Sequence, residues 1–247
     1  MKQNVIRRFA FVAILLSVIC VNLRIAVVRA EDSAAALGEM ETKIAANPDN
    51  LSLGAEYRQM VIRLAAYDRA IAFFEKVASG HPNLANAQLN FGFTYVDKVP
   101  VAGSITQVLL ANNALNAFTR SIEVKPSWIS LYTRGNSYLF WPKIFGRAAN
   151  AVADIEAAMK LQSGAMKPYY IRTWIALGDS YWKTDDFEKA KQAWRDGLKH
   201  FPESAALKSR VAKDGDELKA VIDDTYDITR RVDTSLKEMF ADEVASK

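Results

Sequence analysis

Cysteine is almost absent from this sequence. The single cysteine, Cys20, lies within the first 30 residues, and residues 31–247 contain none. Disulfide bonds, thiol catalysis and cysteine metal centres are therefore excluded from the body of the chain. A lipid-modified cysteine would follow a small residue, and Ile19 is not small. We interpret Cys20 as one more apolar residue of the leading segment.

Histidine is also scarce, and no catalytic spacing is present. His81 and His200 are the only two histidines, and each stands near the end of a repeated unit, where a cation-capable residue suits the helix dipole. The sequence has no H-E-x-x-H motif, glycine-rich phosphate loop or G-x-S-x-G nucleophile. Asp185 and Asp186 stand where a helix is expected to begin, which favours an N-cap over paired acid-base chemistry. We predict no metal, no cofactor and no enzyme activity.

The body of the chain lacks an excess of positive charge. The whole sequence has 32 basic and 28 acidic residues, but five of the basic residues and none of the acidic ones lie in residues 1–30. The remainder is close to neutral, with 27 basic against 28 acidic residues. It therefore offers no basic surface for nucleic acid.

Residues 1–30 have the parts of a secretory signal peptide. A basic start precedes the apolar run "FAFVAILLSVICV", and "VVRA" precedes Glu31. We predict cleavage after Ala30 and export to the periplasm. The alternative is an uncleaved inner-membrane anchor reaching Val28 and holding the protein on the periplasmic side. Arg24 would then lie inside the span, where a central charge costs about 2.5–3.5 kcal/mol on insertion scales.

A period of 34 residues organises the body of the chain. Asn47-Pro48 and His81-Pro82 are 34 residues apart, and so are Pro168 and Pro202. The segment "YIRTWIALGDSYWKTDDFEKAKQAWRDGLKHFP" fits the pattern W-x2-L-G-x2-Y, then A-x3-F, then P. Its matching positions are Trp174, Leu177, Gly178, Tyr181, Ala190, Trp194 in the aromatic slot, and Pro202.

This pattern resembles the tetratricopeptide-repeat family, and the resemblance extends over roughly residues 33–212. It implies an all-α solenoid of antiparallel helix pairs, which stack because one pair cannot bury its apolar face alone. Gly178 and Ala190 would let the two helices of a pair approach closely. We expect full repeats at about 48–82, 83–126, 127–163 and 168–202, within a solenoid domain over 31–212.

The other repeats are looser copies. The first has Arg58 in the glycine slot, and residues 34–48 before it are similar to a lone second helix. The expected structural positions outside the fourth repeat are Phe74, Gly92, Tyr95, Phe118, Gly135 and Tyr138.

Two repeats carry insertions, at residues 97–110 and 140–147. The separation from Gly92 to Ala114 is 22 residues, against 12 from Gly178 to Ala190. Both insertions fall between a first and a second helix, and so on one edge of the solenoid. In the first, Ser104 and Gln107 indicate a capping box for a helix from Ile105 to Val124. The second, "FWPKIFGR", is either a packed corner or a ligand-facing lip.

The C-terminal residues 213–247 are expected to cap the array. Asp214 and Glu217 predict an acidic capping box, followed by one long helix from roughly Asp216 to Phe240. Its apolar residues recur at spacings of three and four. A terminal helix with a polar outer side suits a solenoid cap, and its length also permits a dimer contact.

The family resemblance implies that a partner binds in the concave groove lined by the first helices. The candidates in that register are Ser52, Gln59, Arg63, Asn86, Leu89, Phe93, Ile129, Tyr132, Asn136, Phe140, Arg172, Asp179 and Lys183. Some family members bind the carboxylate tail of heat-shock chaperones through a lysine and an asparagine. Only Asn136 matches that clamp here. The alternative for Phe93 and Tyr132 is packing against neighbouring helices.

Two functions follow from this sequence. The first is an exported adaptor or scaffold that binds a partner polypeptide by its apolar side. The alternative is a structural subunit of an envelope oligomer, assembled through its C-terminal helix. Membrane contact is expected only where the leader remains uncleaved.

Overall fold

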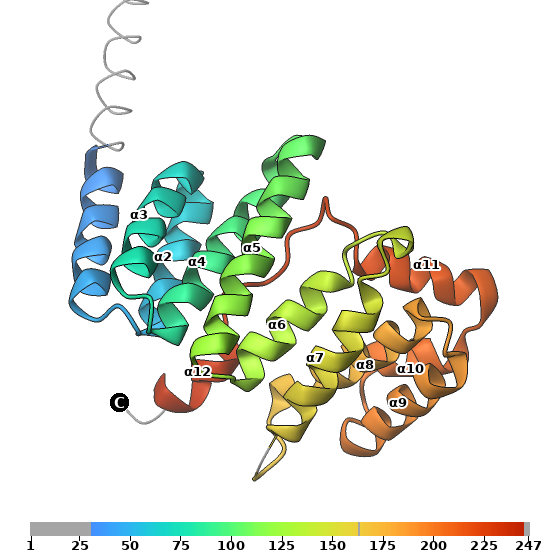
Figure 1. The fold of residues 1–247 in the computed structure, drawn as a ribbon. Helices are drawn as coiled ribbons and strands as arrows, with labels where there is room; N and C mark the ends of the chain where they lie inside the picture. Colours follow the sequence, from blue (N-terminus) through green and yellow to red (C-terminus); the bar gives the residue numbers. More distant parts are fainter. Residues whose placement is uncertain (1–30, 163, 245–247) are drawn as a thin grey trace, which may run out of the picture.

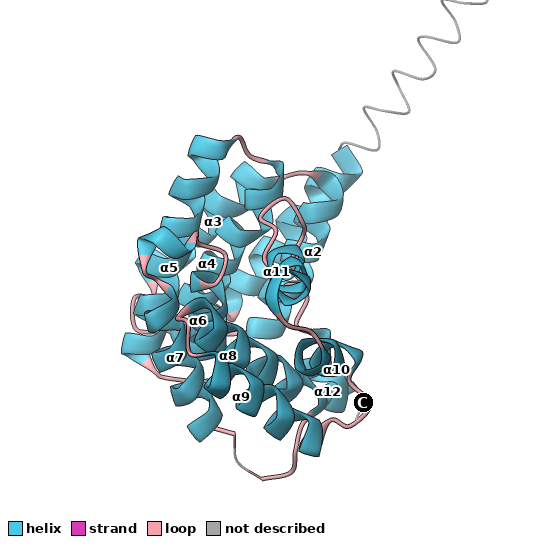
Figure 2. Cartoon of the chain, turned by 90° about the vertical axis from the view of Figure 1, so that its right-hand side faces the viewer, coloured by secondary structure: helices cyan, strands magenta, loops and turns pink. Residues whose placement is uncertain are grey.

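The computed structural model describes residues 31–162 and 164–244, and every regular element in these ranges is a helix (Figures 1 and 2). The predicted all-α fold is confirmed. A first helix spans residues 31–46. The others are α2 (Leu51–Leu64), α3 (Tyr67–Gly80), α4 (Ala85–Lys98), η1 (Val99–Val101), α5 (Ser104–Val124), α6 (Trp128–Tyr138), η2 (Lys143–Phe145), α7 (Ala148–Lys160), η3 (Pro168–Tyr170), α8 (Ile171–Lys183), α9 (Phe187–His200), α10 (Ala205–Ala212), α11 (Gly215–Thr225) and α12 (Lys237–Val244).

The leader lies outside the described residues. Within them, no helix combines the length and the apolar character that a membrane span requires.

The helices form a curved stack of antiparallel pairs, running from blue to orange in Figure 1. α4 packs on α5, α6 on α7 and α8 on α9, and each pair packs on the next through α3–α4, α5–α6 and α7–α8. A large side chain of the second helix lies against the glycine of the first. A Cβ on Gly178 would lie 2.1 Å from Trp194 Nε1, and one on Gly92 would lie 2.3 Å from the Phe118 ring. The glycine slots are therefore positions of close helix contact.

Arg58, in the glycine slot of the first repeat, is fully buried. Its Nη1 donates to Asp97 Oδ2 at 3.3 Å, and its guanidinium lies 4.5 Å from the centre of the Phe93 ring. Burial lowers the pKa of Arg58. This repeat therefore replaces a close helix contact with a buried ion pair.

Side-chain caps fix several helix starts. Asp186 accepts from the Lys189 backbone N–H at 3.3 Å, as expected for an N-cap. Both predicted capping boxes are wrong. α5 begins at Ser104 itself, with Gly103 as its cap, and Gln107 Nε2 instead donates to the Val99 carbonyl at 3.1 Å. Asp214 makes no cap hydrogen bond, because its carboxylate pairs with Lys191 at 2.9 Å.

The prediction of one long C-terminal helix is also wrong. α11 ends at Thr225 and α12 begins only at Lys237. Asp227 accepts from the Thr229 backbone N–H at 2.8 Å, and Asp233 accepts from that of Ser235 at 2.9 Å. Such local side-chain bonds compete with helix formation. Leu218 and Ile222 of α11 still pack on the end of the array. After Thr225 the chain runs away from that end and does not cap it.

Candidate functional site

The candidate site is the concave groove of α4, α6 and α8, together with the segment that covers it. That segment comprises residues 226–240, here called the C-terminal strap, which includes the start of α12. It is the red chain in Figure 1 that runs back from α11 towards α5 before reaching α12. Its contacts with α3 and α4 bridge more than 130 residues of sequence.

Two polar side chains anchor the strap on α3 and α4. Arg231 donates from Nη1 to the Asp97 carbonyl at 2.9 Å and from Nη2 to Tyr67 Oη at 2.9 Å. Thr234 donates its hydroxyl to Asp97 Oδ1, on the carboxylate that also accepts from Arg58. Burial raises the pKa of Asp97, and Arg58 and Thr234 oppose that rise. The Asp97 carboxylate thus links the first repeat to the strap.

Leu236 and Met239 form the apolar anchor. Both pack against the buried cluster that contains Phe93, Trp128 and Ile129. Leu236 has φ 56°, in the left-handed region that costs a non-glycine residue about 1–2 kcal/mol. Its side chain is only partly buried, so packing against this cluster offsets part of that cost.

The strap is also bound to α8. Arg172 Nη2 lies 3.1 Å from Glu238 Oε2 and 4.0 Å from Asp233 Oδ2. At the start of the strap, Tyr226 donates to Asp179 Oδ2 at 2.8 Å, and its ring meets that of Phe140 edge-on at 5.2 Å. Acidic groups of the strap therefore pair with a groove cation, and the ring of Tyr226 is buried against Phe140.

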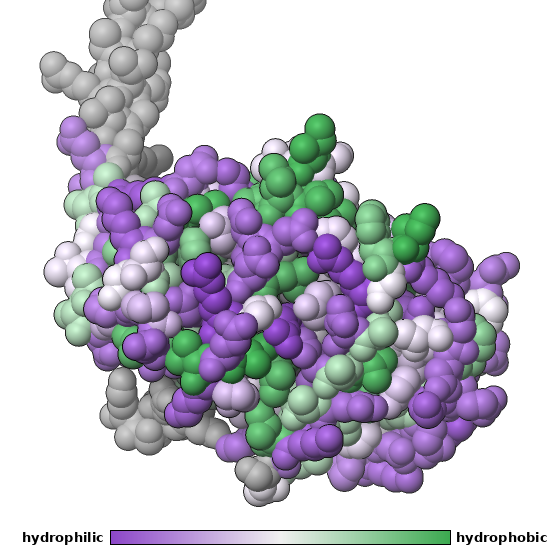
Figure 3. Space-filling view, viewed as in Figure 1, coloured by the Kyte–Doolittle hydropathy of each residue, from purple (hydrophilic) through white to green (hydrophobic). Residues whose placement is uncertain are grey.

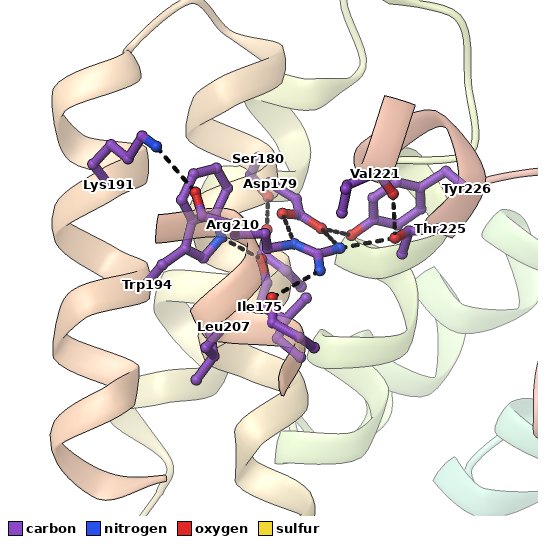
Figure 4. A network of polar contacts seen from close by, with 12 residues as sticks. Ile175, Asp179, Ser180, Lys191, Trp194, Leu207, Arg210, Val221, Thr225 and Tyr226 are labelled. Carbon is purple, nitrogen blue, oxygen red and sulfur yellow. Dashed lines mark hydrogen bonds and ion pairs between the residues drawn. The ribbon is translucent and has the colours of Figure 1, made fainter. Parts of the chain in front are cut away.

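Figure 4 shows how Asp179 joins three elements. The carboxylate of α8 accepts two hydrogen bonds from Arg210 of α10 and one from Tyr226, while Arg210 also donates to Thr225 Oγ1 at 2.8 Å. Burial and the Asp179 charge together raise the pKa of Tyr226 well above its usual value. The junction between α11 and the strap is thereby fixed to the fourth repeat.

Ten of the thirteen predicted groove residues fall into three groups. Tyr132, Asn136, Phe140 and Arg172 line the groove beneath the strap. Leu89 and Asp179 are buried in the protein interior, and Phe93, which is 4% exposed, contributes little surface to the groove cavity that it lines. The third group, Gln59, Arg63 and Asn86, lies outside the strap-lined cavity.

Asn86 acts as a connector between repeats. Its backbone N–H donates to Asp49 Oδ1 at 2.9 Å, and its side chain donates to the Asp49 carbonyl at 3.0 Å. Ile129 is buried beside Phe93, and Lys183 lies over the Tyr226 ring, 4.8 Å from its centre.

The strap leaves part of the groove open. A cavity of ≈ 580 Å³ remains between α4, α5, α6 and the strap, and its lining includes Phe93, Tyr132, Phe140, Trp141 and Leu236. Asn136 also lines it, and within the described part of the chain its side-chain amide has no hydrogen-bond partner. The groove can therefore accept apolar side chains and one further hydrogen bond to the amide.

Tyr132 is the central aromatic residue of this groove. Its ring stacks on that of Trp128, with centroids 5.1 Å apart and planes 2° from parallel. Burial raises its pKa to about 12, against an opposing effect of Arg172. Both alternatives left open by the sequence thus apply to Tyr132, which packs on a neighbour and also lines the groove.

A metal site has little support in the structure. Among the described residues, no group of three histidine, cysteine, aspartate or glutamate side chains could hold a metal ion. His200 stacks on Trp174, with ring centroids 5.4 Å apart, which gives this histidine a packing role.

Comparisons with known proteins agree with this architecture. Residues 171–199 match the family described as tetratricopeptide repeat, and no curated protein sequence matches the chain. A thermophilic TPR protein of Thermus thermophilus has a similar structure, with TM-score 0.52 and 18% identity over 77% of this chain and 94% of that one. A tetratricopeptide repeat protein from Parabacteroides merdae has TM-score 0.52 and 15% identity over 89% and 82%.

YrrB, described as a TPR protein with an unusual peptide-binding site, has TM-score 0.50 and 13% identity over 82% of this chain and 91% of its own. At these identities the likeness establishes the fold alone.

Proposed function

We propose that this chain, whose residues 171–199 match the tetratricopeptide-repeat family and whose fold is similar to that of such proteins, is a non-enzymatic scaffold that binds a polypeptide segment of a partner in its concave groove. The observation that carries this proposal is the docking of the strap, since the groove already holds an extended segment of polypeptide. A partner segment takes the place of the strap and uses the same groups.

The strap indicates the chemistry of that partner. Leu236 and Met239 occupy the apolar groove, and Asp233 and Glu238 lie beside Arg172. A partner segment with two apolar anchors and a flanking carboxylate would satisfy the same side chains. One protein of similar fold is itself described as having a peptide-binding site, which is in keeping with this use of the groove.

The test uses the strap sequence as a probe. A fluorescent peptide of residues 226–247 is titrated into the full chain and into a variant with Arg231→Ala and Leu236→Asp, which weakens the attached strap. A tethered segment has an effective concentration in the millimolar range. We therefore expect little binding by the full chain and saturable binding by the variant, measured by fluorescence anisotropy.

The matched control is a peptide that carries the same two substitutions, which should not bind either protein. A variant that keeps its helical spectrum and still fails to bind the native peptide would refute the groove as a peptide site.

We also propose that the scaffold works in the cell envelope. The basic, apolar leader supports export, with cleavage after Ala30 or retention as an anchor. Mass spectrometry of the envelope fraction distinguishes the two, because a chain beginning at Glu31 supports cleavage and an intact leader supports anchoring. Recovery of the protein only from the cytosol would contradict both.

The strap also supports a second candidate, a structural subunit of an envelope oligomer. A segment that docks in its own groove can dock in that of a second copy, as in domain swapping. Sedimentation of the full chain at rising concentration tests this function. A dimer that is lost in the strap variant supports it, and a monomer at all concentrations contradicts it.

A further inference from the structure

The two insertions expose apolar side chains that nothing in the described structure covers. Ile105, at the tip of α5, is 83% exposed, and Ile144, in the α6–α7 connection, is 90% exposed. The other exposed apolar side chains of these insertions are Val101, Val108, Leu109 and Phe145. Figure 3 shows green projections over the tip of α5 and over the α6–α7 connection. A gathering of exposed apolar side chains marks a contact site with a protein or a membrane.

Chain topology puts both insertions on one edge of the solenoid. First helices run towards this edge and second helices run away from it, so the α4–α5 and α6–α7 connections both lie there. The helix over residues 31–46 is of the second type, and it therefore begins at the same edge. Figure 1 shows its first residues and the tip of α5 both at the top of the view. The described fold therefore begins, directly after the apolar and basic leader sequence, at the edge that carries the exposed apolar tips.

The insertion tips themselves carry little charge, and Asp68 and Asp185, in other connections of this edge, pair with Lys98 and Lys143. Residues 99–119 contain no charged residue. At the second tip the nearby charges are Lys143, which pairs with Asp185, and Arg147, whose guanidinium lies 3.6 Å from the centre of the Trp141 ring. Aliphatic tips flanked by aromatic and basic side chains are typical of segments that lie in a membrane interface.

We propose that this insertion edge docks on the surface of a lipid bilayer, with Ile105 and Ile144 entering the boundary between headgroups and acyl chains. Two features favour a bilayer over a protein partner. Ile105 and Ile144 project outward and do not line the groove cavity, although Val108 and Phe145 of the same insertions do. The apolar leader of the sequence ends at residue 30, directly before a helix that begins at this edge. Docking would orient the groove relative to the membrane, and it does not depend on what the groove binds.

The test places a polarity-sensitive dye at single positions of the full chain. Cys20→Ser removes the native thiol, and a cysteine is then introduced by Ile105→Cys, by Ile144→Cys or, as a control, by Asn83→Cys. Asn83 is exposed in the α3–α4 connection, on the opposite edge. Each labelled protein is mixed with vesicles of phosphatidylethanolamine and phosphatidylglycerol, with or without brominated acyl chains that quench the dye.

We expect a blue shift and quenching at positions 105 and 144 and neither at position 83, whether the leader is present or removed. A label introduced by Leu109→Cys should respond likewise, and lose its response in a protein that also carries Ile105→Asp and Ile144→Asp. Because all these side chains are exposed, the substitutions leave the core intact. Responses at 105 and 144 no larger than at 83 would overturn the proposal. A blue shift without vesicles that grows with protein concentration would also overturn it, by assigning the edge to contact between copies.

Discussion

Arg210 holds Asp179 by a bidentate ion pair in the interior of the protein, with Nε 2.7 Å from Oδ1 and Nη2 2.9 Å from Oδ2. Neither side chain is more than marginally exposed. The pair joins α10 to α8, and Tyr226 adds a third hydrogen bond to the same carboxylate. The end of the repeat array and the start of the strap are therefore both bound to the buried carboxylate of Asp179.

Removal of Arg210 should destabilise the protein strongly. Arg210→Ala leaves the Asp179 charge buried without its partner, and breaking a buried pair in this way costs about 3–5 kcal/mol. Urea denaturation followed by circular dichroism measures the free energy of unfolding. Lys219→Ala is the control, because Lys219 pairs with Asp223 on the solvent side of α11 and should change little. Equal effects of the two substitutions would contradict the buried role of Asp179.

The second prediction concerns the helix contact in the fourth repeat. Gly178→Ala adds a Cβ 2.1 Å from Trp194 Nε1, so the two helices must separate or the indole must move. Overpacking of this kind costs about 1–3 kcal/mol, and Ala190→Leu in the facing helix should have a cost in the same range. Gly80→Ala is the matched control, because no atom lies within 4 Å of its added Cβ. An unchanged thermal midpoint in Gly178→Ala would show that the contact is loose.

The repeat architecture could be predicted because it depends on local pairs of one large and one small residue. Gly178 faces Trp194, and Gly92 faces Phe118, at separations fixed by one helix pair. The period of such pairs specifies the solenoid without any long-range information. Arg58 departs from this pattern, and its buried partner Asp97 lies 39 residues away, so its contact could not be read from one repeat.

The strap could not be predicted because its structure depends on distant contacts. Ile228, Val232 and Leu236 recur at spacings of four, which favours a helix when taken alone. Asp227 and Asp233 instead form local turns, and Arg231 finds its partners on α3 and α4. The density of aspartate, threonine and serine between Asp227 and Ser235 was the one local signal against a helix.

The third prediction is a loss of stability at alkaline pH. The folded protein raises the pKa of Tyr132 to about 12 by burial and raises that of Tyr226 well above its usual value. An unfolded tyrosine has a pKa near 10. The stabilisation is therefore complete below about pH 10 and falls as the pH rises towards about 12. Urea titrations across this range should show the decline.

Tyr226→Phe tests the cause of that decline. This substitution removes one of the ionising groups and the hydrogen bond to Asp179, so it should lower stability at neutral pH and flatten the alkaline dependence. A slope identical to that of the unsubstituted protein would show that Tyr226 does not contribute to it.

Phe93 cannot serve as a clean test of the groove, although it lies beside it. Its side chain is 4% exposed and meets the Phe118 ring at 5.4 Å. Phe93→Ala should therefore cost about 3–5 kcal/mol of stability, as other buried phenylalanines do. Loss of binding in that variant would report unfolding as much as lost contact.

The last prediction uses groove residues that are less buried. In the protein with the weakened strap, Tyr132→Ala together with Arg172→Ala should reduce affinity for the peptide of residues 226–247 by at least roughly 30-fold, because truncated hot spots cost about 2 kcal/mol or more. Tyr132 packs against the cluster that Leu236 also contacts, and Arg172 pairs with Glu238.

Asn136→Ala is the matched control. Asn136 lines the same cavity, yet its amide has no hydrogen-bond partner in the described part of the chain, so affinity for this peptide should hold. Anisotropy titrations of helical, folded variants decide the outcome. Undiminished binding by the Tyr132 and Arg172 variant would place the peptide elsewhere on the protein, and an equal loss in Asn136→Ala would mean that the free peptide docks differently from the attached strap.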